Sequence, residues 1–201
     1  MKIKDIRAHA VRSHRANWVF VVVETEDGQI GVGEASLEVH EDSIVTLVRM
    51  LSRYFIGQDA FAVEQVQDLL PRELYWRGGA VTATAVSGIE GALKDLKGKA
   101  LGVPVYELLG GKVRDRIRVY ANVWLPASAD PQVVADKARK VCDEGFTALK
   151  FDPFYPAYLH MDGKGRARAL RLVEAVRRAI GDEVDLLIEG HGRFNVQTAR
   201  L

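Results

Sequence analysis

The chain has 201 residues, 48% hydrophobic and 27% charged, which is the composition of a globular protein and excludes a disordered or fibrous one. Lysine and arginine (28) nearly balance aspartate and glutamate (27), so the net charge of +1 favours neither nucleic acid nor a membrane surface as a partner. The single cysteine, Cys142, fits a reducing compartment. No apolar run reaches the roughly 18 residues of a membrane span, and residues 1–11 lack the apolar core of a signal peptide. We therefore expect a cytoplasmic protein.

The first part of the chain predicts a small antiparallel sheet. Residues 2–11 alternate loosely, and residues 18–25 (WVFVVVET) are rich in valine and aromatic side chains, as strands are. The Asp27–Gly28 dipeptide is typical of a tight hairpin turn, so residues 29–35 (QIGVGEA) should pair back as the second arm. The GxG in that arm lacks the strand–turn–helix context of a dinucleotide site and does not indicate one.

Helical spacing follows, and it predicts three helices, over residues 43–54, 61–70 and 80–101. Ser43 is the expected N-cap of the first helix, and the second is expected to stop near Pro71. Gly102 closes the third, which is the longest.

Strands and helices alternate after Gly111. Strand patterns occupy residues 117–123, 146–151 and 184–189, and helix patterns occupy residues 131–144, 166–180 and the start of 195–201. This alternation predicts βα units with a parallel sheet. We therefore expect an α+β domain over residues 1–112 and a βα domain over residues 113–201. The last helix has no stop signal, so we expect the chain to be the front portion of a longer polypeptide.

Four polar residues lie where two of the predicted strands end. A strand places residues i and i+2 on one face, which pairs Lys150 with Asp152 in FTALKFDPF and Glu189 with His191 in LLIEGHGRF. The carboxyl ends of parallel strands build the active sites of βα sheets and barrels. The spacing therefore predicts that a cation, two carboxylates and an imidazole converge at one rim.

Each of these residues has a functional and a structural interpretation. Glu189 suits a hard cation such as magnesium, or it forms an ion pair at the strand end. His191, between two glycines, is a general acid or base, or a loop histidine bonded to backbone. Lys150 neutralises a substrate carboxylate or carries a proton, or it forms a salt bridge to Asp152 or Glu189. Asp152 also precedes Pro153, where it could simply form a bend.

Two loops carry aromatic and basic side chains that could cover a ligand. Arg15 and Trp18 belong to the first hairpin, and Trp76 and Arg77 lie between two predicted helices. We expect them to contact substrate from above the site, where a lid would exclude water. Ordinary surface loops are the alternative interpretation.

Four stretches of the chain resemble the enolase superfamily, in particular its mandelate racemase and sugar-acid dehydratase branch. They are VVVETEDGQIGVGEAS, SGIEGALKDLKGKALGVPVYELLGGKVRDRIRVYA, GFTALKFD and LLIEGHGRF. The resemblance implies an α/β fold, in which an α+β capping domain is followed by the first βαβαβ units of a (β/α) TIM-type barrel. It also implies a homo-oligomer, and a small-molecule carboxylate, an acid sugar, as substrate.

The resemblance further implies Mg²⁺ as cofactor and abstraction of the proton alpha to a carboxylate, with the enediolate stabilised on the metal. Glu189 matches the family's first metal ligand, which is more often an aspartate. His191 matches the residue that protonates the departing hydroxyl in sugar-acid dehydratases, and Lys150 matches a lysine close to the substrate carboxylate. Asp152 stands where racemases place a second lysine, and a carboxylate there favours dehydration.

Two alternatives to an acid-sugar dehydratase remain. One is a racemase or cycloisomerase of the same superfamily, and the other is a non-catalytic fragment. The family's remaining metal ligands and its catalytic base are expected on later barrel strands, beyond residue 201.

Overall fold

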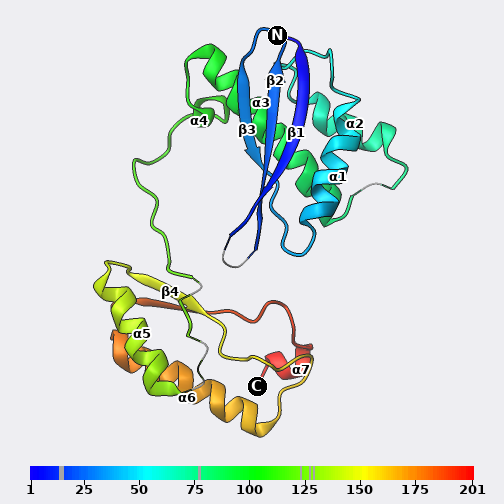
Figure 1. The fold of residues 1–201 in the computed structure, drawn as a ribbon. Coiled ribbons are helices and arrows are strands. Elements are labelled where there is room, and N and C mark those ends of the chain that lie inside the picture. The colour runs from blue at the N-terminus through cyan, green and yellow to red at the C-terminus, as the bar shows by residue number, and fades with distance from the viewer. Residues whose placement is uncertain (14–15, 77, 123, 127, 129) are drawn as a thin grey trace. The chain divides into compact units, whose positions relative to one another are not determined.

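The computed structural model describes residues 1–201 apart from positions 14–15, 77, 123, 127 and 129. The chain forms two compact units, Met1–Val113 and Arg114–Leu201, each with its own buried apolar core (Figure 1). No helix in the described part of the chain is long and apolar enough to cross a membrane.

The first unit contains an antiparallel sheet of three strands in the order β1-β2-β3. The strands are β1 (Ile3–Val11), β2 (Trp18–Thr25) and β3 (Ile30–Glu34). Alternate residues of β2, Val19, Val21 and Val23, are fully buried, as the alternating pattern of a strand with one covered face requires. The fold class predicted from the sequence, with an antiparallel sheet in its first part, is therefore confirmed.

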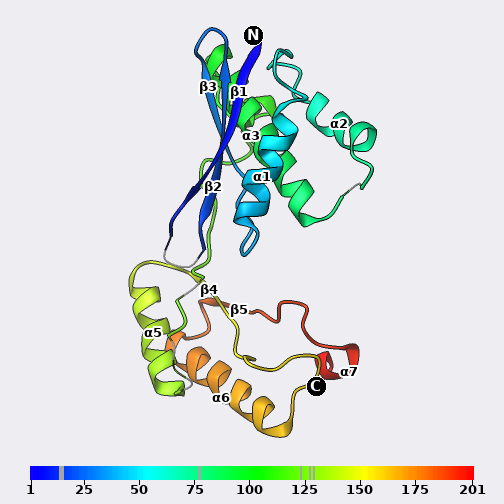
Figure 2. The same ribbon diagram turned by 45° about the vertical axis from the view of Figure 1, so that its right-hand side comes forward.

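Helices cover one face of this sheet (Figure 2). The helices α1 (Glu41–Ser52) and α3 (Ala80–Leu101) pack on the sheet, and α2 (Gln65–Glu73) and the short α4 (Val105–Leu108) pack on α3. The long helix has the predicted bounds, and Gly102 ends it with a left-handed φ of 69°.

The predicted start of the first helix is wrong. Ser43 is not the N-cap of α1, because the helix begins at Glu41 and His40 occupies the cap position without a side-chain hydrogen bond. Glu41 and Asp42 place negative charge in the first turn, where the helix dipole favours it. The second helix, α2, begins at Gln65 and ends at Glu73, two residues after Pro71, which agrees with the expected stop near this proline.

Glycines allow α3 to lie unusually close to β3. A Cβ atom at Gly33 would overlap the carbonyl oxygen of Gly88, and one at Gly31 would overlap that of Ala92. The GxG of this arm therefore serves close packing of a helix on a strand, which agrees with the prediction that it is not a dinucleotide motif.

Side chains of α3 also form hydrogen bonds with backbone groups on the outer edge of β3. The Val32 N–H donates to Oδ2 of Asp95 (2.8 Å), and Lys99 Nζ donates to the carbonyl oxygen of Ile30 (3.1 Å). Lys99 and Asp95 are themselves paired at 2.7 Å. The β3 edge of the sheet is thus bound by an ion pair from α3, the helix that packs on it.

The second unit is built from alternating helices and parallel strands. Its elements are α5 (Pro131–Asp143), β4 (Ala148–Phe151), α6 (Gly163–Ile180), β5 (Asp185–Ile188) and α7 (Val196–Ala199). β4 and β5 pair in parallel, with Lys150 opposite Leu187 and Phe151 opposite Ile188. The helix α6 begins three residues before the predicted start, because the carboxylate of Asp162 caps it by accepting the Gly165 N–H at 2.7 Å.

The strand predicted over residues 117–123 is reduced to a single bridge at Ala121. Its N–H donates to the carbonyl oxygen of Ala148 (2.8 Å), and its carbonyl oxygen accepts the Lys150 N–H (2.9 Å). Ile117 and Val119 are exposed, so the described residues before the bridge add nothing to the core. Position 123 lies outside the described residues.

The close approach of α3 to β3 gives a stability prediction. We expect Gly33→Ala to lower the free energy of unfolding by roughly 3 kcal/mol, the upper range for overpacking, because backbone on both sides must move to admit the methyl group. The measurement is the urea midpoint followed by circular dichroism. Gly163→Ala is the matched control, since its added Cβ meets nothing within 4 Å. Equal midpoints for both variants would contradict the packing argument.

Candidate active site

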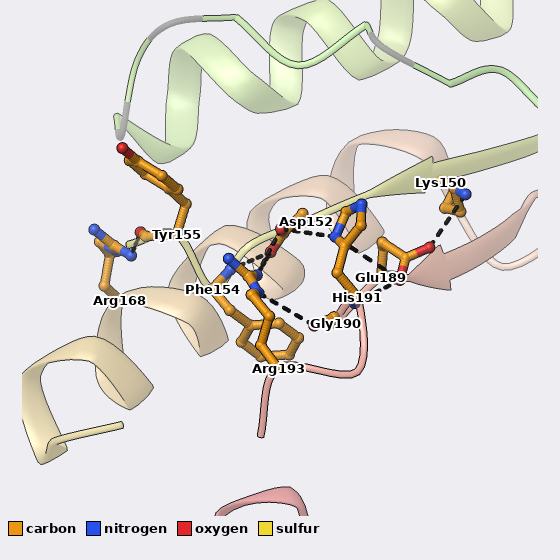
Figure 3. A network of polar contacts seen from close by, with 9 residues as sticks. All are labelled: Lys150, Asp152, Phe154, Tyr155, Arg168, Glu189, Gly190, His191 and Arg193. Carbon is orange, nitrogen blue, oxygen red and sulfur yellow. Dashed lines mark hydrogen bonds and ion pairs between the residues drawn. The ribbon is translucent and has the colours of Figure 1, made fainter. Parts of the chain in front are cut away.

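The parallel pairing of β4 and β5 brings polar side chains together at the carboxyl ends of both strands. Lys150 lies within β4, and Asp152 follows its last residue. Glu189 follows the last residue of β5, and its N–H donates to the carbonyl oxygen of Phe151 (2.9 Å). Figure 3 shows that Lys150, Asp152, Glu189 and His191 face one another. The structure thus brings together the four residues that the strand spacing singled out.

Glu189 is held from two sides. Its Oε1 accepts the backbone N–H of His191 (2.7 Å), and its Oε2 lies 3.2 Å from Nζ of Lys150. The hydrogen bond from the His191 backbone and then the Lys150 ammonium lower the pKa of Glu189 below its ordinary value. The carboxylate is therefore kept ionised, which both an ion pair and a metal ligand require.

Lys150 interacts with an aromatic side chain as well as with Glu189. Its Nζ lies 5.1 Å from the ring centroid of Tyr120, and the lysine side chain is only 20% exposed. The interaction with Tyr120, followed by that with Glu189, raises the pKa of Lys150. The salt bridge to Glu189 that the sequence offered as an alternative is thus present, and it leaves a fixed positive charge beside the carboxylate.

His191 reaches the group through a turn and not through the strand period. It has a left-handed φ of 52°, Gly192 follows with 61°, and the Arg193 N–H donates back to the carbonyl oxygen of Gly190 (3.1 Å). The prediction that a strand period pairs Glu189 with His191 is therefore wrong, because β5 ends at Ile188. The imidazole Nδ1 lies 3.3 Å from Oδ2 of Asp152 and 3.9 Å from Oε1 of Glu189.

Asp152 has more partners than the sequence suggested. Its Oδ1 accepts the Phe154 N–H (2.9 Å), which is the bend-forming bond expected of an aspartate before a proline. Both of its oxygens also accept from Nη2 of Arg193, at 2.7 and 2.6 Å. Asp152 thus both forms the bend and belongs to the polar cluster.

Arg193 is the member of the cluster that the sequence reasoning missed. It stands four residues after Glu189 in LLIEGHGRF, with His191 midway, and an arginine beside two expected carboxylates was the available signal. Its side chain is 18% exposed, and its Nε also donates to the carbonyl oxygen of Gly190 (3.1 Å). A partly buried guanidinium with three hydrogen bonds is a fixed part of this site.

Of the four residues predicted to contact substrate, two lie in the first unit and two lie outside the described residues. Trp18 begins β2 and is 47% exposed, and Trp76 is 84% exposed with its ring edge against Tyr75. Arg15 and Arg77 lie outside the described residues. The contacts of these four residues with substrate stay predictions.

The donor chemistry of Glu189 fits one position of a magnesium site, because a hard cation takes carboxylate oxygens. Among the residues that the structure describes, no group of three or more histidine, cysteine, aspartate and glutamate side chains is arranged to hold a metal ion. Glu189 therefore offers one carboxylate of the kind that such a cation takes.

A parallel βα unit with ionisable groups at the carboxyl ends of its strands is the arrangement found in βα sheets and barrels. Residues 4–110 match the mandelate racemase/muconate lactonizing enzyme N-terminal domain, and residues 133–201 match the enolase C-terminal domain-like family. The chain belongs to the mandelate racemase/muconate lactonizing enzyme family of the enolase superfamily.

Curated relatives and solved structures agree with this assignment. The chain is 43% identical over 182 residues to D-gluconate dehydratase of Thermoproteus tenax, covering 90% of this chain and 37% of the relative. It is 38% identical over 199 residues to D-galactonate dehydratase of Verminephrobacter eiseniae, covering 99% and 50%. A solved enolase superfamily member from Salmonella Typhimurium is 30% identical with a TM-score of 0.89, covering 98% of this chain and 56% of that one. The chain spans about half the length, or less, of these curated relatives.

The pairing of Lys150 with Glu189 gives a prediction for the pH dependence of the site. Lys150→Met should raise the pKa of Glu189, though not fully to its ordinary value, because the His191 N–H still bonds its carboxylate. The pKa of folded Glu189 is lowered, so its interactions stabilise the fold above about pH 4.3, where an unfolded glutamate titrates. That contribution is lost as the pH falls through the lower pKa of the folded group.

The measurement is the titration of glutamate side-chain carboxyl carbons by NMR, with the Glu189 signal assigned from Glu189→Gln. Lys164→Met, which removes an exposed lysine from α6, is the control and should leave the pKa of Glu189 unchanged. If Lys150→Met also leaves it unchanged, the ion pair does not contribute to the charge state of the site.

Proposed function

We propose that this chain belongs to a magnesium-dependent dehydratase of acid sugars. The observation that carries the proposal is that Glu189, His191 and Lys150 lie together at the carboxyl ends of two parallel strands. The names of the relatives, D-gluconate dehydratase and D-galactonate dehydratase, support a small sugar carboxylate as substrate.

The reaction removes the proton alpha to the carboxylate and breaks the bond from the beta carbon to its hydroxyl. A base on another segment takes the alpha proton, and the electron pair of the C–H bond forms the new carbon–carbon double bond. His191 gives a proton to the departing hydroxyl, which leaves as water. The enol that remains tautomerises to a 2-keto-3-deoxy acid. His191 suits its step because its imidazole is 59% exposed while Nδ1 is turned toward Asp152.

Glu189 and Lys150 would together handle the charge of the substrate carboxylate. Glu189 would be one ligand of Mg²⁺, which would supply the positive charge that stabilises negative charge developing on the carboxylate. Lys150 lies 3.2 Å from Glu189 and can turn its ammonium to the substrate carboxylate when Glu189 binds the metal. A flexible lysine stem permits this exchange of partners.

The surroundings of Asp152 favour dehydration over racemisation. A racemase needs a base on each face of the alpha carbon, and Asp152 occupies the position at which the family resemblance would place a lysine base. Both of its oxygens accept from Arg193, and one accepts from Phe154, so the carboxylate is committed to structural contacts. This supports chemistry from one face.

The proposed function predicts that the whole protein converts D-gluconate or D-galactonate to the corresponding 2-keto-3-deoxy acid. A chelator should abolish the activity, and Mg²⁺ should restore it. Glu189→Gln should lose magnesium binding by calorimetry together with activity, whereas Glu183→Gln, an exposed glutamate just before β5, should lose neither. A protein that forms no keto acid from any acid sugar would contradict the proposal and favour a racemase, a cycloisomerase or a non-catalytic fragment.

The role of His191 predicts a separation of the two bond-breaking steps. His191→Asn should slow dehydration by about 10²–10⁴-fold, the usual contribution of a general acid, while exchange of the alpha proton continues. Deuterium uptake from heavy water is measured beside product formation. His160→Asn is the control, because His160 lies in the same unit and contacts Asn195 outside the cluster.

Two results would overturn the role of His191. Loss of both dehydration and exchange in a folded, magnesium-bound His191→Asn variant would make His191 the base, or a ligand of metal or substrate. Full dehydration in this variant would make it a loop histidine with no chemical role.

A further inference from the structure

Arg193 joins two segments of the site through one guanidinium. Its Nη2 lies 2.7 and 2.6 Å from the two oxygens of Asp152, which follows β4. Its Nε lies 3.1 Å from the carbonyl oxygen of Gly190, in the turn that follows β5 (Figure 3). The loop that carries Asp152 and the turn that carries His191 are therefore held at a fixed separation.

The turn held in this way has an unusual backbone. His191 has a φ of 52°, a conformation that non-glycine residues seldom adopt, and it is kept by the bond from its own N–H to Glu189. The Nε bond from Arg193 to Gly190 fastens the residue directly before it. A small movement of this turn would carry the imidazole away from Asp152.

The contact with Asp152 favours one of the two neutral tautomers of His191. Nδ1 of His191 lies 3.3 Å from Oδ2 of Asp152. An ionised carboxylate only accepts hydrogen bonds, so this contact favours the tautomer with hydrogen on Nδ1. The other nitrogen, Nε2, is then left for a ligand, as in histidines oriented by a carboxylate.

We propose that Arg193 is a positioning residue that holds Asp152 against Nδ1 of His191 and thereby leaves Nε2 as the nitrogen that meets the substrate. The catalytic meaning of this arrangement rests on the proposed dehydratase function. The arrangement of Arg193, Asp152 and His191 does not, and it can be tested without substrate or metal.

The backbone around Arg193 has bonds that do not need its side chain. The Arg193 N–H donates to Gly190, the Leu159 N–H donates to the carbonyl oxygen of Arg193 (3.0 Å), and the Asn195 N–H donates to that of Leu159 (3.2 Å). We therefore expect Arg193→Met to fold. Asp152→Asn, which keeps the size of the side chain, provides a second variant.

The test is the ¹⁵N NMR signature of the neutral His191 imidazole in the whole protein without substrate or metal, assigned from His191→Gln. In the wild type we expect the tautomer with hydrogen on Nδ1. Arg193→Met should lose it, and so should Asp152→Asn, whose amide can donate to Nδ1. Arg193→Met should have no further effect in the Asp152→Asn background if Arg193 acts through Asp152.

Arg118→Met is the matched control. Arg118 also pairs with a carboxylate, Asp185, at 2.6 Å and bonds a backbone carbonyl, that of Thr147, at 2.7 Å, but at the opposite ends of β4 and β5. Its loss removes a comparable set of contacts and should leave the His191 signals unchanged. Unchanged His191 signals in a folded Arg193→Met variant, or an equal change in the presence and absence of Asp152, would overturn the proposal.

A second readout connects the arrangement to catalysis. In the whole protein with Mg²⁺, Arg193→Met should lower kcat for dehydration by roughly 10²-fold, the effect of about 1 Å of misplacement, with alpha-proton exchange retained. If the wild type shows no dehydration, the proposed function fails while the tautomer result still decides the role of Arg193. If the wild type is active and Arg193→Met keeps full kcat, the positioning role is refuted.

Discussion

The parallel pairing of β4 and β5 is the constraint on which the candidate site depends. Two strands that run in the same direction end at the same edge, so whatever follows one strand lies beside whatever follows the other. The bond from the Glu189 N–H to the carbonyl oxygen of Phe151 extends the pairing past the last strand residues. It fixes Glu189 next to Lys150 and places the turn after Glu189 next to Asp152.

Two ion pairs hold the site together. Lys150 faces Glu189, and Asp152 faces Arg193, so each carboxylate has its own cation. His191 lies between the two carboxylates, nearer to Asp152. The exposed position of its imidazole leaves it available to a ligand. The same residues thus serve the stability of the strand ends and the chemistry proposed for them.

Much of this could be read from the sequence because it depends on local patterns. Strand alternation and the helix from Ala80 to Leu101 follow from the periods of regular backbone. The failures share a different cause. The start of α1 depends on charge in its first turn, and the turn at His191 depends on a left-handed residue, and no hydrophobic period records either. Arg193 was missed because its partner Asp152 is 41 residues away in the chain.

The ion pair of Asp95 and Lys99 on the rim of β3 has a consequence for the solution behaviour of the protein. An edge strand with unused backbone donors and acceptors is a template on which a strand of another molecule can add. Here the side chains of α3 occupy the N–H of Val32 and the carbonyl oxygen of Ile30, which such a strand would need. The helix α3, which packs on one face of the sheet, therefore also blocks its β3 edge against pairing with a strand of another molecule.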